Sequence, residues 1–128
     1  MEKPDYKNIS IDGSKYYGKH MMLTCESCNE NLLSLNTMKQ FLKELADAID
    51  MIRHGEPIAE RFGDGIQIGI SAVQLITTSA LTVHTNDAAR DLYLDVFSCK
   101  WFEEDAVFEV VSRYYAPQAT THQIVIRR

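Results

Sequence analysis

The chain is poor in the residue types that mark several large classes of protein. Its 128 residues include three cysteines, three prolines, six glycines and one tryptophan. This is too little proline and glycine for a collagen-like or disordered chain, and too little cysteine for a small disulfide-linked scaffold. No apolar run approaches the ~18 residues that a membrane helix needs, and the first ten residues lack the apolar segment of a secretory signal. We therefore expect one domain, no membrane partner and a cytoplasmic location.

Basic residues are also scarce. Thirteen lysines and arginines stand against eighteen aspartates and glutamates, which gives a net charge of -5. Binding to a phosphate backbone depends on clustered basic side chains, and no basic stripe is present, so we expect no nucleic-acid partner. Hydrophobic residues at 45% and charged residues at 24% are otherwise ordinary for a globular domain.

The three cysteines do not form a recognisable metal site. Cys25 and Cys28 make a C-x-x-C pair and Cys99 is distant, whereas a structural zinc site needs four ligands, commonly a second pair or two closely spaced histidines. The four histidines are scattered along the chain. A redox role for the pair stays an alternative, but we favour small buried side chains near a strand end and expect no metal.

Two amphipathic helices are predicted. Asn29 or Ser34 is a candidate cap for the first, and Gly55 and Pro57 follow its expected end. Its apolar residues recur at steps of three and four: Leu32, Leu35, Met38, Leu42, Leu45, Ile49 and Ile52. The second helix is predicted over residues 102–115.

The rest of the pattern predicts strands. Runs rich in β-branched and aromatic residues occupy 17–25, 66–76, 79–85, 91–99 and 121–127, and 58–65 is expected to be irregular or a short extended stretch. The short joints between three of these strands suit antiparallel neighbours. We expect an α+β fold, a two-layer α/β sandwich with a mostly antiparallel sheet and two helices on one face. Residues 1–16 are expected to be a flexible lead-in to a domain spanning 17–128.

Strand alternation indicates where chemistry can occur. In 91–99, Leu92, Leu94 and Val96 form one face, while Tyr93, Asp95, Phe97 and Cys99 form the other; in 79–85, His84 opposes Leu81 and Val83. If the aliphatic residues pack under the helices, His84 and Cys99 emerge together on the open face. Its aromatic residues suggest a second subunit as cover. Taken alone, a lone histidine is more often a hydrogen-bonded structural residue, and a lone cysteine a small buried one.

Three segments resemble one protein family. SAVQLITTSALTVHT at 71–85, YLDVFSCKWF at 93–102 and YGKHMMLTCESCNENLL at 17–33 are similar to the S-adenosylmethionine decarboxylase proenzymes of bacteria and archaea. The most specific part is the spacing of Ser79, His84 and Cys99 in this order of elements. The family makes its own pyruvoyl cofactor.

The resemblance implies a role for each of these residues. The chain would cleave itself between Thr78 and Ser79, and Ser79 would become the pyruvoyl group whose carbonyl condenses with the substrate amine. His84 would be the processing base, Ser71 would assist the ester intermediate, and Cys99 would return a proton to the product carbon. The implied product is the aminopropyl donor for spermidine synthesis. The implied assembly is a homodimer of processed protomers whose sheets meet face to face.

The chain departs from the family pattern at three places. Thr78 replaces a glutamate common before the processing serine, and Ser27 replaces a glutamate that often precedes Cys28. Ala88 stands where the family has a glutamate that holds the substrate ribose, and Asp87, one residue earlier, can substitute if the turn differs. Two alternatives therefore stay open: a pyruvoyl-dependent decarboxylase of ornithine or arginine, and a non-processing homologue that acts as a binding or regulatory subunit.

Overall fold

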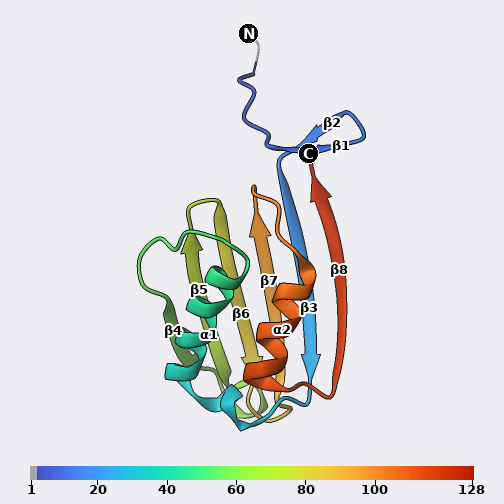
Figure 1. Ribbon diagram of the computed structural model, residues 1–128. Coiled ribbons are helices and arrows are strands. Elements are labelled where there is room, and N and C mark those ends of the chain that lie inside the picture. Colours follow the sequence, from blue (N-terminus) through green and yellow to red (C-terminus); the bar gives the residue numbers. More distant parts are fainter. Residues whose placement is uncertain (1–2) are drawn as a thin grey trace.

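A single six-stranded sheet, covered on one face by two helices, organises the protein (Figure 1). The computed structural model describes residues 3–128. The strands are β3 (Gly18–Glu26), β4 (Ile58–Phe62), β5 (Gly69–Ile76), β6 (Ser79–Asn86), β7 (Asp91–Ser98) and β8 (Ala119–Arg127), and the helices are α1 (Leu35–Ala48) and α2 (Glu104–Tyr115). The strand order is β4-β5-β6-β7-β3-β8, with every neighbouring pair antiparallel. The predicted α+β sandwich is confirmed.

Both candidate capping residues are used at the start of the first helix. Asn29 caps a short 3-10 helix, η1 (Glu30–Leu33), and the Ser34 hydroxyl then accepts the Thr37 N–H at 3.1 Å and caps α1. Side-chain oxygens at these positions satisfy amide groups that have no partner within the helix. The helix ends at Ala48, earlier than predicted. Ile52, which was expected on its apolar stripe, lies beyond the end and is 70% exposed.

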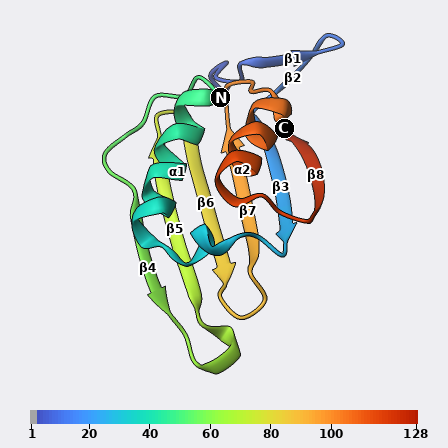
Figure 2. The same cartoon turned by 60° about the horizontal axis from the view of Figure 1, so that its bottom comes forward.

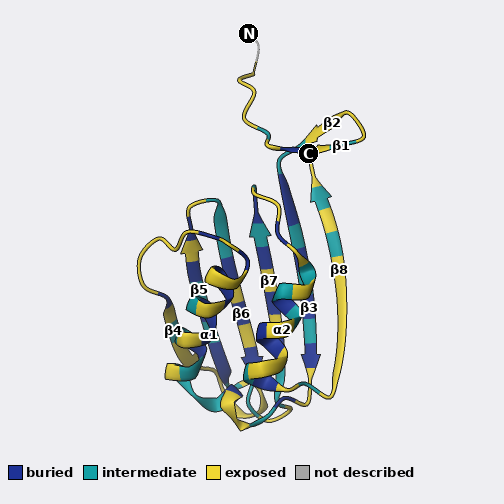
Figure 3. Ribbon diagram, in the orientation of Figure 1, coloured by how far each residue is buried: buried dark blue, intermediate teal, exposed yellow. Residues whose placement is uncertain are grey.

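Both helices lie over the same face of the sheet (Figure 2), and the core lies between them and the aliphatic side chains of the central strands. Leu81, Val83, Leu92, Leu94 and Val96 are all buried, as the alternation predicted. Figure 3 shows that burial is concentrated in the central strands and on the sides of the helices that face the sheet. Within residues 3–128, no helix is long and apolar enough to cross a membrane.

The strand predicted over 66–76 is shorter in the structure. It begins only at Gly69, after a 3-10 turn, η2 (Gly65–Gln67), whereas the stretch 58–65, expected to be irregular or a short extended stretch, contains the edge strand β4. Gly69 approaches β6 so closely that a Cβ atom would lie 1.7 Å from the Thr85 carbonyl oxygen. This contact requires glycine and sets the start of the pairing.

The lead-in contains a hairpin that was not predicted from the sequence. Strands β1 (Ile9–Ile11) and β2 (Ser14–Tyr16) are joined by Asp12 and Gly13, which both have positive φ, as a tight two-residue hairpin turn requires. The hairpin lies beyond the end of the sheet at which β3 begins (Figure 1). Residues 1–2 of the predicted lead-in lie outside the described residues.

Candidate active site

The structure brings Ser71 and His84 into direct contact. They are directly opposite each other in the β5–β6 pairing, and the Ser71 Oγ lies 2.9 Å from the His84 Nδ1. Both belong to the alternate set of residues that faces away from the helices, and Tyr93 is the partner of His84 on its other side. A hydroxyl held against an imidazole is suited to proton transfer.

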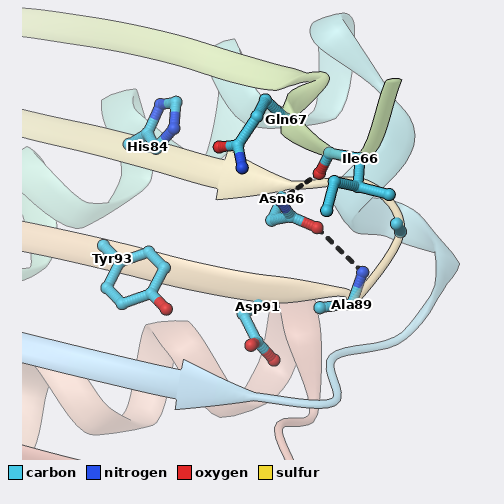
Figure 4. A pocket seen from close by; sticks show the side chains of 8 residues that line it. Ile66, Gln67, His84, Asn86, Ala89, Asp91 and Tyr93 are labelled. Carbon is cyan, nitrogen blue, oxygen red and sulfur yellow. Dashed lines mark hydrogen bonds between the residues drawn. The ribbon is translucent and has the colours of Figure 1, made fainter. Parts of the chain in front are cut away.

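A pocket of about 580 Å³ adjoins His84 at the end of the sheet where β6 turns into β7 (Figure 4). It is lined by Ile66, Gln67, His84, Asn86, Ala88, Ala89, Asp91 and Tyr93. The amide of Asn86 is fixed, because it donates to the Ile66 carbonyl at 2.7 Å and accepts the Ala89 N–H at 2.9 Å. The pocket therefore combines one fixed amide, one imidazole, one carboxylate and an aromatic ring.

Two aspartates near this pocket have different surroundings. Asp87 is paired with Arg61 at 2.9 Å and does not line the pocket. Asp91 does line it, and its Oδ1 accepts the Ser27 N–H at 3.1 Å. Sequence reasoning did not single out Asp91, although the alternation that placed Tyr93 on the open face places Asp91 there as well.

The Thr78–Ser79 junction lies at the opposite end of β6. Thr77 and Thr78 form a two-residue turn between β5 and β6, and Ser79 is paired with Ser98 on β7. The Thr78 carbonyl oxygen accepts the Cys99 N–H at 3.0 Å. The structure thus brings Cys99 to the predicted cleavage junction, and its side chain there is half-buried.

The two groups of predicted site residues are far apart within one chain. Ser79 and His84 are five residues apart on an extended strand, which corresponds to about 16 Å. Ser79 also belongs to the alternate set that contains the buried residues Leu81 and Val83, whereas His84 belongs to the exposed set. The imidazole of His84 is therefore not in reach of the Ser79 hydroxyl of the same chain.

The Y-G-K-H segment of β3 supports the end of the sheet that carries Ser79. A Cβ at Gly18 would lie 2.8 Å from the Phe97 ring, so this position requires glycine. Lys19 is 1% exposed, and its Nζ donates to the Phe102 carbonyl at 2.7 Å and to Glu104 at 2.8 Å. These bonds hold the segment that follows Cys99. His20 lies 3.3 Å from Asp95 on the open face.

The C-x-x-C pair has the properties of buried structural thiols. Burial, and secondarily the neighbouring thiol of Cys28, raises the pKa of Cys25 to about 12. Burial and the charge of Asp91 raise the pKa of Cys28 to about 11. Both thiols are therefore protonated near neutral pH, whereas only the deprotonated thiolate is a good nucleophile or metal ligand. No group of three or more potential metal ligands gathers within the described part of the chain.

Comparison with known proteins identifies the family. The family model for S-adenosylmethionine decarboxylase matches residues 19–128. The chain belongs to this family. Two S-adenosylmethionine decarboxylase proenzymes of Clostridium botulinum, from strains Loch Maree / Type A3 and 657 / Type Ba4, are each 31% identical over 86 residues, or 66% of this chain and 71% of the relative. The resemblance inferred from the sequence is confirmed.

A solved structure shares the fold of this S-adenosylmethionine decarboxylase family member. The crystal structure of the adenosylmethionine decarboxylase from Aquifex aeolicus VF5 matches 89% of this chain and 92% of its own, with a TM-score of 0.75 and 15% sequence identity. At this identity the match supports the architecture, while the family assignment rests on the sequence.

Proposed function

We propose that the protein is a self-processing, pyruvoyl-dependent S-adenosylmethionine decarboxylase whose product is the aminopropyl donor for spermidine synthesis. One contact carries the proposal beyond family membership. The carbonyl of Thr78, the group that cleavage must attack, already accepts the N–H of Cys99 at 3.0 Å. A fixed donor at a carbonyl that will become negatively charged is the arrangement that stabilises acyl-transfer intermediates.

Cleavage follows from groups at this junction. The Ser79 hydroxyl adds to the Thr78 carbonyl carbon, and the Cys99 N–H stabilises the charge that develops on the carbonyl oxygen. The Thr78–Ser79 C–N bond then breaks and the nitrogen takes up the hydroxyl proton, which converts the amide into an ester. A base removes the Ser79 Cα proton, and Thr78 leaves as a carboxylate. Water hydrolyses the resulting dehydroalanine, releasing ammonia and leaving a pyruvoyl group at residue 79.

The surroundings of Ser79 suit this group and its task. Residue 79 is the first residue of β6 and is half-buried, and the half-buried Cys99 reaches the junction through its backbone N–H. When present, the pyruvoyl group supplies a carbonyl that accepts the electrons freed as carbon dioxide leaves. Cys99 then delivers a proton to the substrate carbon. We assign the reaction to the cytoplasm, where such a thiol stays reduced.

The proposed site needs two copies of the chain. The Ser71–His84 pair is about 16 Å along β6 from Ser79 of the same chain, so it cannot serve as the local base. In a two-fold dimer, each copy presents the same surface in the opposite direction. If the open faces meet, the His84 end of one β6 lies over the backbone at the Ser79 end of the other, where the Cα proton to be removed is located, while the Ser79 side chain itself belongs to the helix-facing set. The exposure of Tyr93, an aromatic residue that is 47% exposed, supports this face as the interface.

The substrate then extends from Ser79 of one copy into the pocket of the other. S-adenosylmethionine carries a sulfonium cation and a ribose diol, and both groups interact favourably with a carboxylate. Asp91 is the carboxylate that lines the pocket, whereas Asp87 is engaged by Arg61. We therefore favour Asp91 over Asp87 as the residue that replaces the glutamate absent at Ala88.

Two measurements test the proposal. Incubated protein is expected to resolve into two fragments on a denaturing gel, with mass spectrometry finding a pyruvoyl group at residue 79. The processed protein is expected to release carbon dioxide from S-adenosylmethionine and not from ornithine or arginine. A chain that stays whole would support the binding or regulatory alternative instead. Release of carbon dioxide from ornithine or arginine, and not from S-adenosylmethionine, would support the alternative of a decarboxylase for one of those amino acids.

A further inference from the structure

Two side-chain hydroxyls meet at the proposed cleavage junction. The Ser98 Oγ donates to the Thr78 Oγ1 at 2.8 Å and accepts the Lys100 N–H at 2.9 Å. The Thr78 hydroxyl in turn donates to the Met51 Sδ at 3.4 Å. Ser98 is fully buried. The hydroxyl of Thr78 is therefore held by a directed series of hydrogen bonds that begins at the segment after Cys99.

The turn that contains the junction depends on such outside contacts. A two-residue hairpin turn matches the twist of its strands best when one or both turn residues have positive φ. Neither Thr77 nor Thr78 has positive φ. The contacts that hold the turn are instead tertiary: the Thr77 N–H donates to the Ile52 carbonyl at 2.9 Å, the Thr78 carbonyl accepts from Cys99, and the Thr78 hydroxyl is bonded to Ser98.

We propose that Ser98 and Thr78 are positioning residues for self-cleavage. Their hydroxyl–hydroxyl bond fixes the orientation of residue 78 and so keeps its carbonyl on the Cys99 N–H, ready for attack by Ser79. This proposal rests on the proposed self-cleavage and adds the residues that set the rate of its first step. It also gives a function to the threonine that stands where the family commonly has glutamate.

The experiment follows cleavage of freshly synthesised chain. Cell-free synthesis followed by a denaturing gel at timed intervals gives the half-time for wild type, Ser98→Ala, Thr78→Val and the double variant. Loss of the bond is expected to slow cleavage about tenfold in each single variant, because one oriented hydrogen bond is removed. The double variant is expected to be no slower than the slower single variant, since both substitutions break the same bond.

Thr77→Val is the matched control. Thr77 belongs to the same turn, but its side chain is exposed. Thr77→Val also removes a hydroxyl, but its half-time of cleavage is expected to stay within about twofold of wild type, as is typical of surface substitutions. Ser98→Thr, which keeps the hydroxyl, is expected to recover most of the rate.

Hydroxylamine separates positioning from a general loss of structure and identifies the step. Hydroxylamine cleaves esters, so it accelerates chain scission only where the ester has accumulated. We expect no acceleration in Ser98→Ala, where formation of the ester is slow, and strong acceleration in His84→Ala, where its elimination is slow. Thermal unfolding checks that Ser98→Ala is folded, and Thr78→Val decides the question if it is not.

Three results would overturn the inference. Both single variants cleaving at the wild-type rate would refute the positioning role while leaving the proposed function intact. Acceleration of Ser98→Ala by hydroxylamine would assign the hydroxyl to the later step and contradict its role in ester formation. Failure of the wild-type chain itself to cleave would remove this inference together with the proposed function.

Discussion

The two ends of β6 carry different halves of the predicted chemistry. At one end, Ser79 follows a turn whose carbonyl is bonded to the Cys99 N–H. At the other end, His84 is bonded to Ser71 beside a polar pocket. In the proposed mechanism, the first end holds the bond that breaks and the thiol, and the second holds the proton acceptor and the place for the substrate.

This division shows that residues close together in the sequence need not belong to the same site in one chain. Ser79 and His84 are close in sequence, but an extended strand separates them by about 16 Å. The two halves become one site only if β6 of a second copy runs over the first in the opposite direction.

Mixing two inactive variants tests whether the ends act across a dimer. Ser79→Ala alone is expected to abolish cleavage, because the nucleophile is lost, and His84→Ala alone is expected to slow cleavage by ~100-fold or more, as expected for loss of a general base. In a mixed dimer, the His84→Ala chain keeps Ser79 and faces an intact His84. We expect this chain, and not its partner, to be cleaved on a denaturing gel.

If neither chain were cleaved in the mixture of Ser79→Ala and His84→Ala, a site shared between two copies would be excluded. The control is a mixture of Ser79→Ala with a chain carrying both Ser79→Ala and His84→Ala, in which no nucleophile is present. Size-exclusion chromatography should show that both mixtures contain dimers.

Cys99→Ala is expected to separate the two reactions at the Ser79 end. The backbone N–H that binds the Thr78 carbonyl remains, so cleavage should proceed, whereas the thiol proposed to reprotonate the product is lost. Turnover per processed chain is expected to fall by ~100-fold or more, the usual contribution of a general acid. Gel and mass spectrometry measure cleavage, and carbon dioxide release measures turnover. Unchanged turnover would refute the role of the thiol.

The two aspartates at the pocket end form a matched pair for substrate recognition. Asp91→Asn is expected to raise KM for S-adenosylmethionine about tenfold, because a charge-assisted hydrogen bond is lost, with a smaller effect on kcat. Asp87→Asn is expected to leave KM within about twofold of wild type, since its carboxylate is bound by Arg61. The reverse order of effects would assign recognition to Asp87. Initial rates over a range of substrate concentrations measure both constants.

The smallest effect concerns Cys25, a buried thiol at the His84 end of the sheet. Its pKa is raised from 9.0 to about 12 by burial. Above pH 9 the unfolded chain therefore loses a proton that the folded chain retains, so stability is complete below this pH and falls as the pH rises. The expected slope is about 1.4 kcal/mol per pH unit for this thiol. Urea unfolding between pH 8 and 10.5 measures it, with Cys25→Ala expected to have a shallower slope.

Much of the architecture could be read from local pattern. The alternation of Leu81, Val83, Leu92 and Leu94 predicted which face of the sheet is buried, because successive strand residues point to opposite sides. The stripe on α1 and the cap at Ser34 were predicted from helical spacing and hydroxyl chemistry. The β1–β2 hairpin was missed, although Asp12-Gly13 is a strong turn signal.

The site was less accessible to the same reasoning. Ser71 and Ser79 were selected by resemblance, and His84 and Cys99 by strand alternation as well, but neither argument indicated that the four residues form two separate groups. Asp91 was missed because a carboxylate was expected at the family position, Ala88, or at its neighbour. The face that Asp91 shares with Tyr93 was not considered. The Ser98–Thr78 bond joins residues on two different strands and has no signature in the local sequence.

The sequence by itself determined the family, the class of fold and the side of the sheet that faces the helices, because these depend on residue identity and short-range periodicity. The tertiary structure alone decided which groups meet. Strand pairing placed His84 against Ser71 and brought the Cys99 N–H to the Thr78 carbonyl. Such contacts arise from the register between strands, which is fixed by the packing of the whole sheet rather than by any one segment.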